Sequence, residues 1–251
     1  MGDVLLRHVL ERIAAAPLRV EPFAHLYFER IFPEDYYEAL LRHLPDPVLY
    51  EPLFHKDALR PDGSTTRSTF TLDADSIARV PEASRETLRR SADVFGSEDF
   101  RDAILGRYVG TLGERFGAAG VPPLECTVKL QRDLPGYQIG VHPDTTDKVV
   151  LVQLYLPATD ARRHMGTSLY VPAGDGFAVS QTLAFARNSG FSFAKTANSW
   201  HGVEPVIDAE RHSLTVNYRL REQKLRRVLR KRVLRQLRRW TRRLQGGPGA
   251  A

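Results

Sequence analysis

The stretch Gly140–Lys148, which reads GVHPDTTDK, decides how the rest of the chain is interpreted, because an apolar strand ends there in a histidine and an aspartate. His142 and Asp144 are two residues apart. Side chains with this spacing point to the same face of an extended strand end, so both can reach one cation. Pro143 and the residues after it are also ordinary turn formers. The pair alone therefore leaves two interpretations open, a metal site and a plain strand exit.

Length and composition indicate a globular protein with a substantial core. The chain has 251 residues, of which 42% are hydrophobic, enough for one large domain or a domain with an appendage. Its single cysteine, Cys126, excludes an intrachain disulfide and fits a reducing compartment. Charged residues interrupt the apolar pattern of residues 1–17, which is not typical of a signal peptide. We therefore expect a cytoplasmic protein.

The charges are segregated along the chain. From Arg219 onward there are 13 basic residues and one acid, whereas residues 1–218 carry 23 basic and 29 acidic residues. The sequence thus predicts an acidic body with a basic tail.

The first half of the chain is predicted to be mainly helical. Apolar spacing indicates helices over 3–16, 33–45, 82–93 and 97–117, with a strand within 20–32. Residues 55–75 are polar and rich in turn formers, with a short strand at 68–72. A loop of this length is typical of a lid or a binding loop. Arg60 and Arg67 lie in it and are candidates for contacting an anionic substrate, although a solvated surface arginine is the favoured interpretation of either one.

The second half of the chain is predicted to be β-rich. Short strands separated by Gly and Pro turns are expected at 125–132, 138–141, 149–156, 168–171, 182–186, 191–195 and 212–219. Strands at this spacing favour an antiparallel sandwich or barrel. The fold class is therefore α+β, with a helical part over 1–120 and a β core over about 121–220.

A second group of candidate site residues lies further along the chain. His201 stands in NSWHGVEPV, after a strand-like segment, and a histidine there could equally cap a turn. Arg211 and Ser213, in RHSLTVNY, share one face of a strand. An arginine that points into a sandwich needs an anion, because an unpaired buried charge is costly. A guanidinium next to a hydroxyl is well shaped to bind a carboxylate.

Two histidines and one carboxylate can occupy one face of an octahedral iron(II) ion and leave three positions open. The order His142, Asp144, His201, Arg211, Ser213 resembles that of the iron(II) and 2-oxoglutarate-dependent oxygenases, in particular their prolyl-hydroxylase-like branch. The resemblance is most specific in GVHPDTTDKVVLVQLYLP, NSWHGVEPV and RHSLTVNY. It spans roughly residues 126–218.

The resemblance implies a double-stranded β-helix, or jelly roll, with iron bound by His142, Asp144 and His201. It also implies that Arg211, helped by Ser213, binds the distal carboxylate of 2-oxoglutarate. The reaction would use dioxygen to hydroxylate a C–H bond and would release succinate and carbon dioxide. Halogenating relatives have a small residue at the position of Asp144, so the aspartate favours hydroxylation.

Two further features concern the walls of this site. Gln131 and Tyr155 lie on strands where family members often place a polar group near the cosubstrate, although a cross-strand polar pair and a core tyrosine explain them equally well. Many members carry a Gly-Gly-acid stretch on a middle strand, whereas this chain has RRHMGTSLYVP. The wall on the substrate side is therefore not defined by the resemblance.

The basic tail is predicted to form an amphipathic helix over 221–245, followed by a disordered end at 246–251. Its apolar stripe, which includes Trp240, has three candidate partners. It could pack on the body or on a second subunit of a homodimer, it could lie on the anionic inner face of a membrane, or it could bind nucleic acid. Nucleic acid is the least favoured partner, because stacking aromatics are nearly absent.

Two functions follow from these patterns. The leading hypothesis is a single oxygenase domain over 1–220 that hydroxylates an anionic substrate, either a small metabolite, an amino acid, or a sugar or glycolipid. The alternative is a non-catalytic or cupin-like metal-binding protein that acts at a membrane or polyanion through its basic helix.

Overall fold

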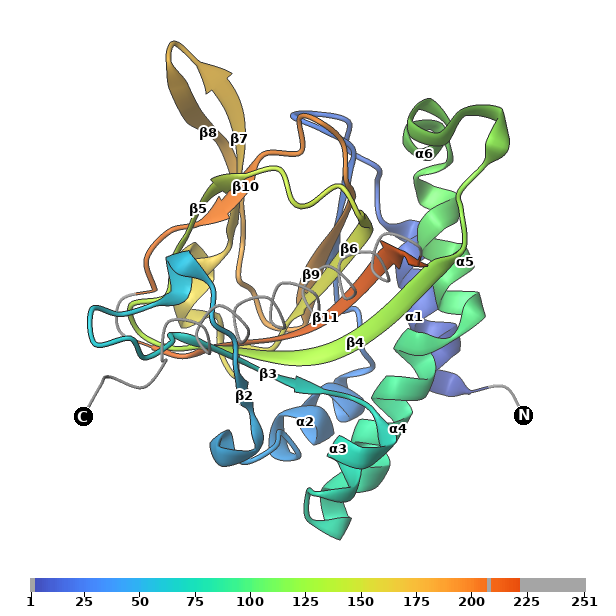
Figure 1. Ribbon diagram of the computed structural model, residues 1–251. Helices are drawn as coiled ribbons and strands as arrows, with labels where there is room; N and C mark the ends of the chain where they lie inside the picture. The colour runs from blue at the N-terminus through green and yellow to red at the C-terminus, as the bar shows by residue number, and fades with distance from the viewer. Residues whose placement is uncertain (1–2, 207–208, 222–251) are drawn as a thin grey trace, which may run out of the picture.

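The computed structural model describes residues 3–206 and 209–221. Two antiparallel sheets face each other in this part of the chain, and helices α1, α4 and α5 cover the outer side of the larger sheet (Figure 1). The helices are α1 Val4–Ala15, α2 Glu34–Arg42, α3 Ala74–Ala78, α4 Glu82–Gly96, α5 Glu98–Arg107 and α6 Val109–Phe116. The strands are β1 His25–Glu29, β2 Glu51–Pro52, β3 Arg67–Thr71, β4 Leu124–Asp133, β5 Ile139–His142, β6 Lys148–Tyr155, β7 Thr167–Ala173, β8 Gly176–Leu183, β9 Ser189–Ala194, β10 His201–Val203 and β11 Arg211–Leu220.

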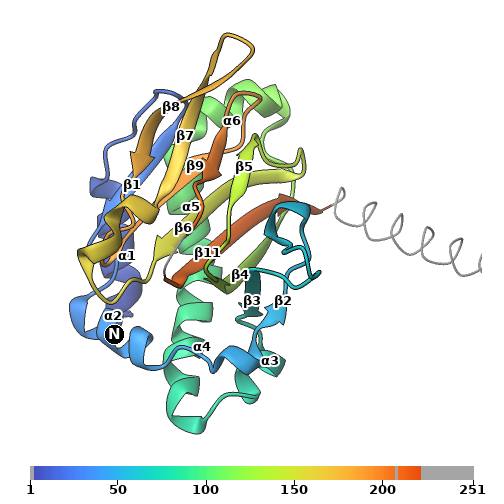
Figure 2. The same cartoon turned by 90° about the vertical axis from the view of Figure 1, so that its left-hand side faces the viewer.

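The strand order shows how distant segments come together. In the described part of the chain the larger sheet has the order β1-β9-β6-β11-β4-β3-β2, and the smaller has the order β5-β10-β7-β8. Figure 2 shows the smaller sheet in front of β6, β9 and β11. The N-terminal strand β1 pairs with β9, so the first part of the chain supplies one edge strand of the larger sheet.

Strands β4 and β11 of the larger sheet have one apolar face and one polar face. Leu130 of β4, Leu154 of β6 and Val216 of β11 pack in the core that the helices cover. The alternate residues point between the two sheets, as the two-residue repeat of a strand requires. On β4 and β11 these inward residues are polar, among them Gln131 and Ser213. The fold therefore places polar side chains inside the sandwich.

The predicted helices are confirmed, with one break. The helix predicted over 97–117 is two helices, α5 and α6, because Tyr108 leaves the helical conformation at φ −112° and ψ 19°. Gly106 and Gly110 lie on either side of it, and glycine is a poor helix former. The short helix α3 was not predicted. It begins after Asp73, whose side chain accepts a hydrogen bond from the backbone N–H of Ser76.

The predicted strands are confirmed except at one place, and two short strands, β2 and β10, were not predicted. The strand predicted at 182–186 is mostly wrong, because β8 spans Gly176–Leu183 and forms a hairpin with β7. Gly174, at φ 55°, makes the turn of that hairpin. The three-residue strand β10 was missed, since it is too short to show a period.

The predicted basic helix over 221–245 and the predicted disordered end lie outside the described residues, apart from Arg221. Within residues 3–206 and 209–221, no helix combines the length and the hydropathy that a membrane crossing requires.

Candidate metal centre

The two histidines of the site lie opposite each other on neighbouring strands of the smaller sheet. His142 ends β5 and His201 begins β10, and the two are register partners with ring centroids 4.4 Å apart. Asp144 follows two residues after His142 with φ at 52°. Aspartate tolerates this left-handed conformation better than most residues. The backbone thus brings all three predicted metal ligands together.

The ligand atoms of the three side chains lie within 4.8 Å of one another. The Nε2 atom of His142 is 3.7 Å from Oδ1 of Asp144, and Nε2 of His201 is 3.8 Å from Oδ2. The Nδ1 atom of His142 lies 2.9 Å from the backbone oxygen of Gly140. The Nδ1 atom of His201 lies 2.9 Å from the backbone oxygen of Ser199. A carbonyl only accepts, so each Nδ1 carries the proton and each Nε2 offers its lone pair.

The electrostatics of Asp144 suit a cation. Lys148 donates a hydrogen bond to Oδ1 at 2.7 Å, and among the described residues the buried Oδ2 has no hydrogen-bond partner. Burial is the largest single influence on Asp144 and works to raise its pKa, but Lys148 and the two histidines together outweigh it and lower that pKa to about 2. Burial lowers the pKa of His201 to about 4. At neutral pH the site therefore holds a carboxylate and a neutral imidazole, as a metal ion requires.

These features fit a divalent metal ion. Two imidazole nitrogens and one carboxylate form a donor set that non-haem iron(II) commonly takes, with open positions for other ligands. The orphaned Oδ2 of Asp144 would gain the partner that it lacks.

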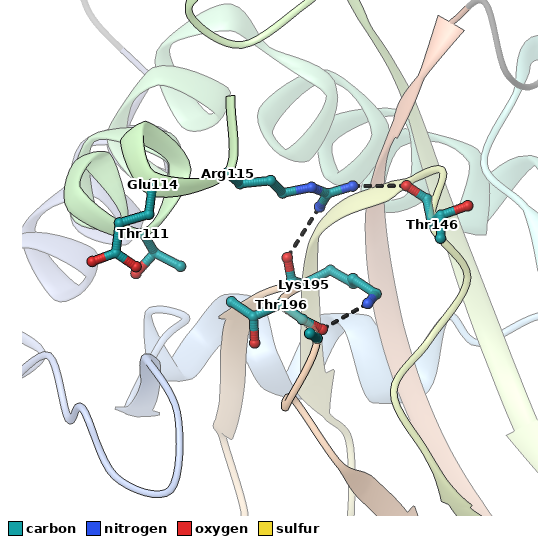
Figure 3. Close-up of a pocket in the computed structure, with 7 residues that line it drawn as sticks. Thr111, Glu114, Arg115, Thr146, Lys195 and Thr196 are labelled. Carbon is teal, nitrogen blue, oxygen red and sulfur yellow. Dashed lines mark hydrogen bonds between the residues drawn. The ribbon is translucent and has the colours of Figure 1, made fainter. Parts of the chain in front are cut away.

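Arg115 in α6 holds the loop that carries Asp144. Its guanidinium donates hydrogen bonds to the backbone oxygens of Thr146 at 2.7 Å, Lys148 at 2.8 Å and Lys195 at 3.0 Å. Figure 3 shows Arg115 reaching from its helix towards Thr146 and Lys195, while Glu114 points away. These residues line a cavity of about 390 Å³. Arg115 thus ties the metal-site loop to the end of β9.

Two connected cavities meet at the metal site. The inner chamber has a volume of about 140 Å³ and is lined by His142, Asp144 and His201, together with Thr167 and Gln131. The outer groove has a volume of about 690 Å³ and is lined by His142 and Asp144 but not by His201. The metal ligands therefore lie at the boundary between the chamber and the groove.

Arg211 is completely buried, and the anion that it contacts is a carboxylate of the protein. It donates hydrogen bonds to Oδ2 of Asp133 and to Oγ1 of Thr167, each at 3.2 Å. Arg67 also donates to Asp133, at 2.6 and 3.0 Å. Two guanidinium groups thus share one carboxylate, and Nε of Arg211 has no partner among the described residues. Beside the chamber, this arrangement leaves positive charge that one more carboxylate would balance.

The other predicted residues lie close to Arg211. Ser213 accepts a hydrogen bond from Gln153 at 3.0 Å. Tyr155 donates to Oγ1 of Thr167 at 3.0 Å, and its ring lies 5.3 Å from the guanidinium of Arg211. Gln131 lines both cavities, whereas Arg211, Ser213 and Tyr155 line neither. Thr167 and Gln153 stand between these three residues and the chamber.

Sequence reasoning missed several residues that shape the site. Asp133, Thr167, Gln153 and Lys148 were not predicted, because their roles depend on partners in distant segments. Strand alternation was the available signal, since Asp133 and Gln153 lie on the inward face of their strands. Arg60, a candidate for contacting an anionic substrate, donates to the backbone oxygen of Pro135 at 2.9 Å and lines neither cavity.

Comparison with solved structures identifies the fold. A Pseudomonas putida prolyl-4-hydroxylase is 20% identical, with a TM-score of 0.50, over 86% of this chain and 99% of that one. A prolyl 4-hydroxylase from Phytophthora capsici is 17% identical, with a TM-score of 0.52, over 88% of this chain and 68% of that one. No protein-family model and no curated protein sequence matches the chain.

At these identities the likeness shows the fold. The predicted α+β jelly-roll architecture is confirmed for the described residues, and the resemblance to the prolyl-hydroxylase-like oxygenases is confirmed at the level of the fold.

Proposed function

We propose that the protein is an iron(II) and 2-oxoglutarate-dependent dioxygenase that hydroxylates an unactivated C–H bond. The observation that carries the proposal is the cluster of His142, Asp144 and His201, whose ligand atoms lie within 4.8 Å of one another and whose side chains line the inner chamber. When bound, iron(II) with 2-oxoglutarate and dioxygen would supply the oxidising power for hydroxylation, with succinate and carbon dioxide as the other products.

The protein's own residues would hold and orient the iron. The backbone carbonyls of Gly140 and Ser199 fix the two imidazoles in the tautomer that presents Nε2. Lys148 fixes the carboxylate of Asp144 through Oδ1 and leaves Oδ2 available. The ligand set would thus be formed before the metal arrives, which lowers the cost of ordering it.

The inner chamber is suited to 2-oxoglutarate. Thr167 lines the chamber and accepts a hydrogen bond from Arg211, whose Nε is free among the described residues. The distal carboxylate of the cosubstrate would bind there, because the two guanidinium groups of Arg67 and Arg211 share a single carboxylate of the described residues, that of Asp133. Ser213, Gln131 and Tyr155 would support it from the surrounding strands.

Part of the chamber wall would keep water away from the metal. Leu151 and Phe191 come from the larger sheet and Val203 from the smaller one. Phe191 is completely buried. A partly apolar wall strengthens the electrostatic interactions inside the chamber and limits side reactions with solvent.

An anaerobic titration tests this proposal. The wild-type protein should bind iron(II) and 2-oxoglutarate together and give a weak visible charge-transfer band. The band should vanish in His142→Ala and in His201→Ala but persist in His164→Ala, which changes an exposed histidine outside the cluster. A wild-type protein that binds neither ligand would overturn the proposal.

The substrate would occupy the outer groove beside His142 and Asp144. Candidates are small anionic metabolites, amino acids, and sugars or glycolipids. The two similar structures are named as prolyl 4-hydroxylases, so prolyl peptides belong in the same panel. Substrate-stimulated release of succinate identifies the hit. A cupin-like metal protein without this activity would release no succinate with any compound.

The charge segregation supports a second, separate proposal, that residues 221–245 bring the enzyme to an anionic membrane surface. Flotation with anionic vesicles should retain the full chain and lose a variant that ends at residue 220. Equal flotation of the two proteins would remove this proposal and leave the oxygenase proposal untouched.

A further inference from the structure

Lys129 of β4 lines the outer groove. It is half-buried on β4, opposite Thr71 of β3 and Thr215 of β11. It lines the groove but not the inner chamber. Among residues 3–206 and 209–221, no hydrogen bond or ion pair is found for its ammonium group.

The other cations of β3, β6 and β11 that line the groove are each paired with a carboxylate. Lys148 donates to Asp144 at 2.7 Å. Arg219 donates to Asp147, also at 2.7 Å. The third, Arg67, has the ion pair with Asp133 that is described above. Of these four lining residues, only Lys129 has no such partner in the described structure.

The surroundings of Lys129 are suited to a polar ligand. The neighbouring side chains that face the groove offer hydroxyl and amide groups, namely Thr69, Thr127, Gln131, Thr215 and Asn217. Among the described residues that line the groove, the only carboxylate is that of Asp144, the proposed metal ligand. An anion in the groove would therefore find several hydrogen-bond partners and little repulsion.

The positive charge of Lys129 is not balanced by a carboxylate of the described residues. The residue is half-buried between its strand neighbours Thr71 and Thr215. Partial burial of an unpaired charge is unfavourable, and the reduced dielectric strengthens its attraction to an anion. A ligand that brings a negative charge would relieve this cost.

We propose that Lys129 binds the anionic group, a carboxylate or a phosphate, of the molecule that is hydroxylated. The inference rests on the proposed function in one respect, that the substrate lies in the groove next to the metal. It restricts the substrate to a polar molecule with a negative charge away from the reacting carbon.

Nuclear magnetic resonance of methylated lysines tests the proposal directly. Reductive ¹³C-dimethylation keeps the positive charge and gives each of the six lysines its own signal. The full-length protein is loaded with 2-oxoglutarate and with zinc(II) as a diamagnetic replacement for iron. The Lys129 signal is the one that disappears in Lys129→Arg. Acetate and inorganic phosphate are then titrated separately, at constant ionic strength.

The Lys129 signal should shift saturably with at least one of the two anions. The anion that binds with the higher affinity shows whether the substrate carries a carboxylate or a phosphate. The signals of Lys148 and Lys195 provide internal controls, because their ammonium groups already have partners. Equal shifts of all lysines, or no saturable shift of Lys129, would overturn the proposal.

A pair of variants completes the test. Lys129→Met should weaken binding of the preferred anion about 10-fold to 100-fold, the range expected for a hydrogen bond to a charged group. Arg89→Met removes an exposed positive charge on α4 and should leave binding unchanged.

Lys129→Met should keep the charge-transfer band of iron(II) and 2-oxoglutarate. Absence of the band in the wild-type protein would refute the oxygenase proposal. An unchanged anion affinity in Lys129→Met would refute the proposed role of Lys129.

Discussion

His142 and His201 are direct partners in an antiparallel strand pair, with ring centroids 4.4 Å apart. The distance between the two imidazoles is therefore set by the pairing of two backbones rather than by flexible side chains. Strands pair at a fixed spacing, so the site is formed by the fold itself. Asp144 completes it from a loop that Arg115 holds by three hydrogen bonds.

Replacing Asp144 with Asn should abolish iron binding while keeping the fold. Asparagine has the same shape and also tolerates the positive φ of 52°, but it has no negative charge. Because loss of a supporting partner already costs 10-fold to 100-fold in metal affinity, loss of a ligand should cost more than about 100-fold. Competition with a coloured chelator measures the affinity, and circular dichroism monitors the fold. A folded variant with unchanged iron affinity would contradict the assignment of Asp144 as a ligand.

Replacing Arg115 with Met should loosen the loop that carries Asp144. The change removes three hydrogen bonds to backbone carbonyls and should lower iron affinity about 10-fold, as for other supporting partners of metal ligands. Hydrogen exchange of residues 144–148 should accelerate, with little change in the distant strand β1. The matched control is Glu114→Gln, which changes an exposed neighbour that points away from the loop. If exchange accelerates equally throughout the protein, Arg115 supports global stability rather than the loop.

Two adjacent substitutions on β6 should have very different effects on stability. Leu154→Ala creates a cavity in the core under the helices and should lower the free energy of unfolding by about 2–5 kcal/mol. Gln153→Ala, on the inward face, removes one hydrogen bond to Ser213 and should cost only about 1 kcal/mol. Urea denaturation measures both changes. Comparable losses would show that the two faces of this strand are not energetically distinct.

Cys126 should react slowly with alkylating reagents in the folded protein. Burial raises the pKa of its thiol to about 11, from an ordinary value of 9.0. Two pKa units correspond to about 100-fold less thiolate, the reactive form, at pH 8. Since the pKa is raised on folding, the thiol's contribution to stability is fully present below about pH 9 and is lost as the pH rises through 11.

Iodoacetamide labelling with and without urea, followed by mass spectrometry, measures the reactivity of Cys126. Labelling of the native protein at pH 8 should be far slower than labelling in urea. Equal rates in the two conditions would contradict the raised pKa.

The grouping of the three candidate metal ligands could be predicted from the sequence because it depends on local spacing and chain order. His142 and Asp144 are two residues apart, which places their side chains on one face of a strand end. Strand alternation also correctly predicted that Arg211 and Ser213 point into the sandwich. The roles predicted for these residues towards iron and cosubstrate remain predictions. The strand β10, which holds His201, was too short to recognise although the histidine itself was identified.

The long-range partners could not be predicted from the sequence. Asp133 lies between Arg67 and Arg211, and these three residues come from three different strands. A single sequence contains no signal for which of many acids and arginines will meet. The same limit applies to Lys129, whose lack of a partner becomes visible only when the neighbouring strands are in place.

The two-faced character of the larger sheet has a consequence for how this protein could change over evolution. The apolar side chains of β4, β6 and β11 that face the helices provide packing, whereas the residues between them face the groove and the chamber. Substitutions at Thr69, Thr127 or Asn217 would alter which molecule fits the groove while leaving the packed face intact. A new substrate preference could therefore arise through single changes without loss of the folded state, and directed libraries confined to these positions should retain a high fraction of folded variants.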